Sequence, residues 1–137
     1  MRYRVLIVDD EPAVRRALER ALRHFGYEAI SASGGDSAYE VLANDTFDAI
    51  LLDIRMPLMA GDTLFVAIVR RWPELRHRII LMSGDADSAA RGWSAELKSR
   101  PLLDKPFNFE TLHQTIQSVL EESAQSQSRP KLGNGQA

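Results

Sequence analysis

The sequence predicts an α/β fold in which helices cover a parallel β-sheet. Short apolar runs alternate along the chain with longer segments in which apolar residues recur at helical spacing. This alternation is typical of strand–helix units, whose strands lie parallel in one sheet. The chain has 137 residues, of which 45% are hydrophobic and 26% are charged. These values fit a single globular domain with a sizeable core.

Proline and glycine mark element ends in the first half of the chain. Pro12 suits the first turn of a helix, and Gly26 suits the position just after its end. Pro73 stops the third helical pattern, because proline cannot continue a helix. The expected strands are residues 5–8, 28–32 and 49–52, and the expected helices are residues 12–25, 36–43 and 64–72.

The second half repeats the alternation. We expect strands at residues 79–82 and 102–103, a helix near 88–97 that contains Gly92, and a last helix capped by Asn108. The Ser/Gln/Gly-rich residues 123–137 lack an apolar pattern. We therefore expect one domain at residues 1–122, followed by a disordered polar tail or linker remnant.

Composition excludes several classes of protein. The chain has no cysteine, so it has neither a disulfide scaffold nor a thiolate metal site. No apolar stretch approaches membrane-spanning length, and the N-terminus leaves no room for a signal peptide, so we expect a cytoplasmic protein without membrane contact. The net charge of −2 argues against direct nucleic-acid binding. A basic set on the first helix favours a solvated face: Arg15, Arg16, Arg20 and Arg23.

Acidic residues directly follow two of the expected strands. Asp9 and Asp10 come after the first strand, and Asp53 comes after the third. The carboxyl ends of parallel strands share one edge of the sheet, which is where ligands bind in α/β folds. Three carboxylates gathered there repel one another unless a cation lies among them, and Mg²⁺ prefers such hard oxygen ligands. The pattern predicts a Mg²⁺ site and chemistry on an anion such as phosphate.

Two further polar residues follow the fourth and fifth strands. An aspartate carboxylate can attack phosphorus and form an acyl phosphate. Lys105 would neutralise charge on the transferring group, and the Ser83 hydroxyl would donate a hydrogen bond to a phosphoryl oxygen. Taken singly, these are a solvated lysine and a turn serine. Their convergence with the acids at one edge favours a phosphoryl site.

Four segments of the chain resemble the receiver domains of response regulators in two-component signalling. They are VDDEP at residues 8–12, LDIRMP at 52–57, MSG at 82–84 and DKPF at 104–107. The resemblance covers residues 3 to about 122. It implies a doubly wound, flavodoxin-like sheet of five parallel strands in the order 2-1-3-4-5, with five helices.

The resemblance also implies roles for individual residues. Asp53 would be the phosphoacceptor, and Lys105 would contact the phosphoryl group next to a cis bond to Pro106. The Mg²⁺ ligands would be the carboxylates of Asp9, Asp10 and Asp53 and the backbone carbonyl of Arg55. Ser83 would supply the hydroxyl group that takes part in the activation switch.

One position departs from the family pattern, and two charges flank the site. Many receivers carry Tyr or Phe three positions before the lysine, and this ring turns inward on activation; here the residue is Leu102. An aliphatic side chain cannot report phosphorylation by the same ring movement. Arg55 and Asp85 would either pair above the site and hinder attacking water, or be two exposed loop charges of little consequence.

We therefore expect a phosphorylatable receiver and not an enzyme. It would accept a phosphoryl group from a histidine kinase or a histidine phosphotransfer protein and act on an unknown protein partner, as a monomer or weak homodimer. One alternative is a phosphorelay intermediate, because the fifth strand resembles receivers of hybrid kinases. Others are a Mg²⁺-dependent phosphohydrolase with an Asp nucleophile, which would need a cap domain, and a degenerate receiver that serves as a pure interaction module.

Overall fold

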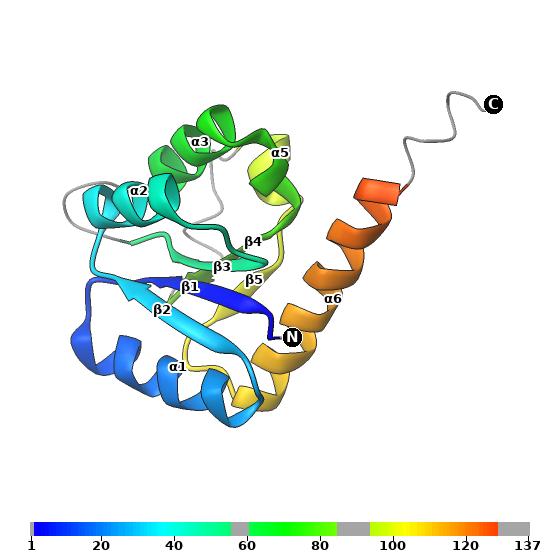
Figure 1. Cartoon of the computed structure of the whole chain (residues 1–137). Helices are drawn as coiled ribbons and strands as arrows, with labels where there is room; N and C mark the ends of the chain where they lie inside the picture. The colour runs from blue at the N-terminus through cyan, green and yellow to red at the C-terminus, as the bar shows by residue number, and fades with distance from the viewer. Residues whose placement is uncertain (1, 56–60, 85–93, 129–137) are drawn as a thin grey trace.

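Five parallel strands form one sheet at the centre of the molecule (Figure 1). The computed structural model describes residues 2–55, 61–84 and 94–128. The strand order is β2-β1-β3-β4-β5, which confirms the order expected from the resemblance. The strands are β1 (Arg4–Val8), β2 (Glu28–Ala32), β3 (Ala49–Asp53), β4 (Ile79–Ser83) and β5 (Leu102–Asp104).

Helices cover both faces of the sheet, so the fold is doubly wound. Figure 1 shows α2, α3 and α5 on one face and α1 and α6 on the other. The helices are α1 (Pro12–His24), α2 (Gly35–Asn44), α3 (Gly61–Arg71), α5 (Ala95–Lys98) and α6 (Phe109–Ser128), with a 3₁₀-helix η1 (Pro73–His77). No helix in the described part of the chain is long and apolar enough to cross a membrane.

The two helical layers explain why the central strands read as continuous apolar runs. Successive side chains of a strand point to opposite faces, and both faces of this sheet are covered. In β1, Leu6 and Val8 belong to the core beneath α2 and α3. Val5 and Ile7 belong to the core shared with α1 and α6. All four side chains are fully buried.

Local chemistry sets most of the element ends. Pro12 is the first residue of α1, and Gly26 follows its end with a φ of 92°, a conformation that favours glycine. The side chain of Asn108 caps α6, because its Oδ1 accepts a hydrogen bond from the Thr111 N–H at 2.7 Å. Pro73 ends the α3 pattern as expected. The chain then continues into η1, an element that the apolar spacing did not indicate.

Two expected helices have different limits in the structure. Of the helix expected near 88–97, the described part is α5, and Gly92 lies outside the described residues. The last helix continues to Ser128, so residues 123–128 are helical and do not begin the polar tail. The apolar repeat ends at Leu120, but polar contacts of the following turn hold the helix in place: Arg78 Nε donates to Ser123 Oγ at 3.1 Å.

A buried arginine ties α6 to the sheet. The Arg100 side chain is 4% exposed, and its Nε donates to the carbonyl of Ile79 at 3.0 Å. Its Nη1 lies 2.8 Å from Glu122 Oε2, and His77 Nδ1 lies 3.0 Å from the same oxygen. Partial burial opposes ionisation of Glu122, but the hydrogen bonds from Arg100 and His77 outweigh it and lower the pKa of this carboxyl.

Removing this arginine is expected to weaken the fold. Arg100→Ala leaves the Ile79 carbonyl without its side-chain donor and Glu122 without its main cation. We expect the free energy of unfolding in urea to fall by about 2–3 kcal/mol. A fall of less than about 0.5 kcal/mol, the usual range for surface substitutions, would contradict this.

The same cluster makes the stability depend on pH. The pKa of Glu122 is lower in the folded protein. Its contribution is therefore fully present above the unfolded pKa of about 4.3 and is lost as the pH falls through the folded pKa. Glu122→Gln should lose less unfolding free energy on acidification below about pH 4.3 than the unmodified protein. Glu121→Gln, an exposed neighbour, is the matched control, and equal acid slopes for both variants would contradict the prediction.

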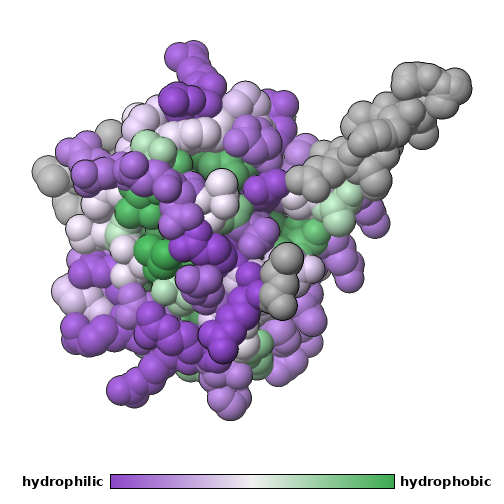
Figure 2. All heavy atoms as spheres, in the orientation of Figure 1, coloured by the Kyte–Doolittle hydropathy of each residue, from purple (hydrophilic) through white to green (hydrophobic). Residues whose placement is uncertain are grey.

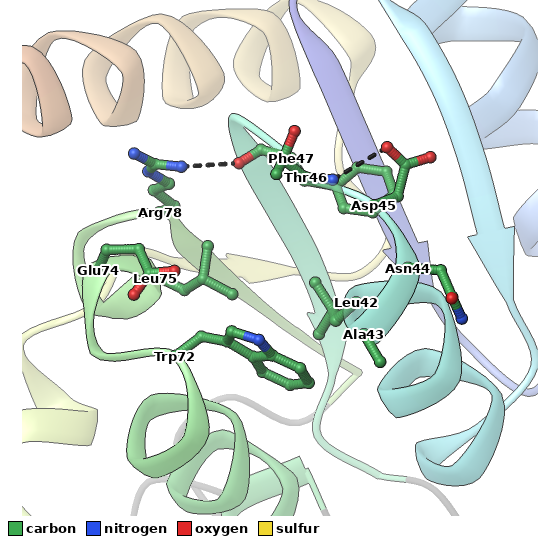
Figure 3. A pocket seen from close by; sticks show the side chains of 10 residues that line it. All are labelled: Leu42, Ala43, Asn44, Asp45, Thr46, Phe47, Trp72, Glu74, Leu75 and Arg78. Atoms are coloured by element: carbon green, nitrogen blue, oxygen red, sulfur yellow. Dashed lines mark hydrogen bonds between the residues drawn. The ribbon is translucent and has the colours of Figure 1, made fainter.

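A hollow of about 370 Å³ lies at the amino-terminal edge of the sheet, between the end of α2 and η1 (Figure 3). Its polar groups are largely bound within the chain. Arg78 Nη1 donates to the Phe47 carbonyl at 3.0 Å, and Asp45 forms an ion pair with Arg4. Phe47 and Arg78 precede β3 and β4, so the hollow lies at the end of the sheet opposite Asp53. We interpret it as a structural gap between elements.

Candidate functional site

Three carboxylates meet at the carboxyl-terminal edge of the sheet. β1 and β3 are paired neighbours with Val8 opposite Leu52, so the next residues, Asp9 and Asp53, lie side by side. Asp9 is fully buried and Asp53 is 4% exposed, whereas Asp10 is more open to solvent. Oxygen atoms of the three carboxylates lie within 4.8 Å of one another. The structure thus brings together all three acids that the sequence indicated.

The chain fixes both oxygens of Asp9. Oδ1 accepts a hydrogen bond from the Glu11 N–H at 2.9 Å, and Oδ2 accepts one from Lys105 Nζ at 2.8 Å. The carbonyl of Asp9 accepts a further hydrogen bond from Arg15 Nη1 at 2.7 Å. The sequence placed Arg15 among solvated basic residues. Arg15 lies in the first turn of the helix that follows Asp9 and Asp10. This closeness in the sequence could have indicated that Arg15 contacts the site.

Lys105 places an ammonium group between two of the acids. Its Nζ lies 2.8 Å from Asp9 Oδ2 and 3.5 Å from Asp53 Oδ2. The backbone N–H of Lys105 donates a hydrogen bond to the Ser83 carbonyl at 2.7 Å. The peptide bond between Lys105 and Pro106 is cis, as expected. Burial favours the neutral amine, but the hydrogen bond to Asp9 and the charge of Asp53 outweigh it and raise the pKa of Lys105. The side chain therefore remains a cation at neutral pH.

Asp53 is held in place by a backbone hydrogen bond and lies close to two other carboxylates. Its Oδ1 accepts a hydrogen bond from the Arg55 N–H at 3.1 Å. Burial raises the pKa of Asp53, the Arg55 N–H lowers it, and the negative charge of Asp9 raises it again; the net shift is upward. The three carboxylates, when ionised, and the Lys105 ammonium sum to two negative charges among these four groups. A divalent cation bound by carboxylate oxygens fits this excess.

The site opens to solvent through a hollow of about 390 Å³. It is lined by Asp10, Glu11, Asp53, Arg55, Gly84 and Lys105. A phosphoryl group can therefore approach Asp53 from solvent. Arg55 lies at this opening, and its effect on attacking water stays a prediction. Asp85, the other candidate for tuning the site, lies outside the described residues.

Comparison with known proteins identifies the family. Residues 5–117 match the response regulator receiver domain. The chain belongs to this family. It is 30% identical over 131 residues to the probable transcriptional regulator ycf27 of Porphyridium aerugineum, which covers 96% of this chain and 53% of that protein. It is 36% identical over 120 residues to the sensor kinase CckA of Brucella abortus, covering 85% of this chain and 12% of the kinase. The chain thus spans about half or less of these two relatives.

Solved receiver structures have the same fold. The response regulator TrrA of Thermotoga maritima, in complex with Mg²⁺ and BeF, superposes with a TM-score of 0.75 at 28% identity, covering 88% of this chain and all of TrrA. The chemotaxis protein CheY4 of Vibrio cholerae gives a TM-score of 0.72 at 29% identity with the same coverage. The family match and the shared fold together show that the chain is a response regulator receiver domain of two-component signalling.

Ser83 occupies the place expected for the switch hydroxyl of a receiver. It is the last residue of β4, fully buried, and pairs in register with Asp104 of β5. β4 lies between β3, which carries Asp53, and β5, which leads to Lys105. The fold thus brings Ser83 to the same edge of the sheet as Asp53 and Lys105. Its hydrogen bond to a phosphoryl group stays a prediction, as does the metal contact of the Arg55 carbonyl.

Leu102 is part of the core of this receiver. It is the first residue of β5, pairs with Leu81, and packs half-buried against the core beneath α2 and α3. Because its side chain ends in two methyl groups, it gains by burial and has no polar group to turn towards water. The structure therefore places an aliphatic packing residue at the position of the usual aromatic switch.

Proposed function

We propose that this receiver accepts a phosphoryl group from a phosphohistidine onto Asp53 in a Mg²⁺-dependent reaction. The observation that carries the proposal is the geometry of Asp53. Its carboxylate is buried at the edge of an open hollow, 3.5 Å from the Lys105 ammonium, and its oxygens lie within 4.8 Å of those of Asp9 and Asp10.

Asp9, Asp10 and Asp53 would hold the Mg²⁺ ion. Bound there, the ion would neutralise charge on the phosphoryl oxygens during transfer. The excess of negative charge at the three carboxylates supports this assignment, as does the likeness to TrrA, whose structure contains Mg²⁺ and BeF. The backbone carbonyl of Arg55 is the proposed additional ligand.

The side chains of this chain divide the remaining work. Asp53 attacks the phosphorus, so that an O–P bond forms while the P–N bond to the donor histidine breaks. The Arg55 N–H holds Oδ1 of Asp53, which keeps the carboxylate oriented towards the hollow. Lys105 neutralises the developing charge, and Ser83 donates a hydrogen bond to a phosphoryl oxygen.

The donor would be a histidine kinase or a histidine phosphotransfer protein, and the signal would pass through changed protein–protein contacts. A phosphorelay intermediate is the second candidate, because the chain is 36% identical to part of the sensor kinase CckA. In either role the protein would accept one phosphoryl group and lose it slowly. It would not turn over a substrate, and it would act in the cytoplasm.

Acetyl phosphate tests the proposal without a cognate kinase. With Mg²⁺ present, we expect the intact mass to increase by one phosphoryl group, and we expect EDTA to prevent this. Repeated turnover of a small phosphate ester would support the phosphohydrolase alternative. No response to acetyl phosphate or to beryllofluoride with Mg²⁺ would support the pure interaction module.

A further inference from the structure

A further groove lies between α3 and α5, on the helical layer that also contains α2. It has a volume of about 320 Å³ and shares no lining residue with the hollow above Asp53. Its lining residues come from α3, from η1 and from the start of α5. Its lining residues are Phe65, Val66, Val69, Arg70, Pro73, Arg76, Ser94 and Glu96.

The floor of the groove is apolar. Phe65 and Val69 are one helical turn apart on α3 and are buried, with 2% and 9% exposed. Val66 faces outward and is 48% exposed, which makes it one of three exposed large apolar residues among those the structure describes, with Tyr3 and Phe109. A β-branched residue lowers helix propensity, and at this exposure it gains little from the core. Val66 therefore adds an exposed apolar side chain beside the apolar floor.

The rim of the groove carries unbalanced positive charge. Arg76 Nε and Glu96 Oε2 form an ion pair at 3.1 Å that joins η1 to α5, so the one acid of the lining is already paired. Arg70 lies one turn after Val66 and is exposed. Arg70 forms no ion pair with any residue in the described ranges. Within the described part of the chain, the exposed Val66 thus lies next to a guanidinium that no carboxylate neutralises.

Figure 2 shows one face of the molecule, on which hydrophilic residues dominate and apolar residues form smaller patches. A free phosphate or a nucleic acid would not use an apolar floor, and the chain's net charge of −2 does not favour a polyanion. A peptide segment suits both features, because it can supply an apolar side chain and carboxylates together.

We propose that the groove between α3 and α5 docks a segment of a partner protein in which an apolar side chain is flanked by carboxylates. The apolar side chain contacts Val66 and Pro73, and a carboxylate pairs with Arg70. Arginine is one of the residue types enriched at the positions that carry most binding energy in interfaces. This docking goes beyond phosphoryl transfer and does not depend on Asp53.

Selection of random phage-displayed peptides on the intact protein tests the proposal. We expect the enriched peptides to combine an apolar residue with Asp or Glu. Synthetic fluorescein-labelled copies are then titrated by fluorescence anisotropy. Arg70→Glu should weaken their binding by about tenfold or more, and Val66→Ser by about fivefold. Arg20→Glu on α1 is the matched control for charge reversal, since Arg20 is exposed on the opposite layer, and its binding should stay within about twofold.

Several outcomes would overturn the proposal. They are a selection without enrichment, enrichment of basic peptides, and peptides that bind Arg70→Glu and Val66→Ser as tightly as the unmodified protein. A dimer in analytical ultracentrifugation that Val66→Ser abolishes would identify a second copy of the chain as the occupant. Urea unfolding of each variant shows that the fold is retained. Asp53→Asn should bind the same peptides with unchanged affinity, so a failure of phosphorylation is distinguishable from a failure of docking.

Discussion

Asp53→Asn is expected to abolish phosphorylation by both acetyl phosphate and phosphohistidine donors. The amide lacks the nucleophilic oxygen charge that attacks phosphorus. The substitution keeps the shape of a side chain that is only 4% exposed. The measurement is the loss of the mass increase after incubation with acetyl phosphate and Mg²⁺. The label on the unmodified protein should be removed by hydroxylamine, which cleaves acyl phosphates.

The same variant should remain folded, because it relieves charge repulsion at the site. Burial and the nearby charge of Asp9 raise the pKa of Asp53, so its ionised form is disfavoured in the metal-free protein. We expect an unfolding free energy equal to that of the unmodified protein or up to about 1 kcal/mol higher at neutral pH. Asp36→Asn at the start of α2 is the matched control, and it should be phosphorylated normally. Hydroxylamine-sensitive label on Asp53→Asn would refute the assignment of the phosphoacceptor.

Lys105→Met is expected to slow phosphoryl transfer by about 10²–10³-fold. The substitution keeps the aliphatic stem and removes the ammonium that lies 2.8 Å from Asp9 and 3.5 Å from Asp53. Mg²⁺ binding should be retained or strengthened, because the carboxylates then lack a competing cation. Single-turnover phosphorylation and calorimetric titration with Mg²⁺ separate the two effects. Lys98→Met, at an exposed position of α5, should change neither.

Lys105→Met should also lower stability, and Mg²⁺ should restore part of it. Without the ammonium, the buried carboxylate of Asp9 keeps only the Glu11 N–H as a hydrogen-bond donor among its described contacts. We expect a loss of about 2–3 kcal/mol in the absence of metal. Saturating Mg²⁺ should recover part of this loss, because it binds only the folded state. A transfer rate within about twofold of the unmodified protein would contradict a role for Lys105 in transfer.

The buried central strands could be predicted from the sequence alone. Residues 5–8 and 49–52 are continuous apolar runs because both faces of the sheet are covered, and this pattern is visible without a structure. Asp9 and Asp53 directly follow these runs, so parallel strands were enough to place them at one edge. The order of the strands came from the family resemblance, since apolar spacing does not show which strands are neighbours.

Tertiary structure decided which polar groups find one another. Lys105 and Asp9 are 96 positions apart in the sequence yet 2.8 Å apart in space. Arg100, which lies between α5 and β5, forms an ion pair with Glu122 of α6. The spacing of residues along the sequence predicts neither pairing, because a hydrogen bond depends on the distance between two groups in the folded chain. The polar contacts of Glu122 and Ser123 likewise extend α6 to Ser128, where the apolar repeat has already ended. The sequence thus determined the sheet and its carboxylates, and the packing of helices on that sheet decided what those carboxylates and the last helix contact.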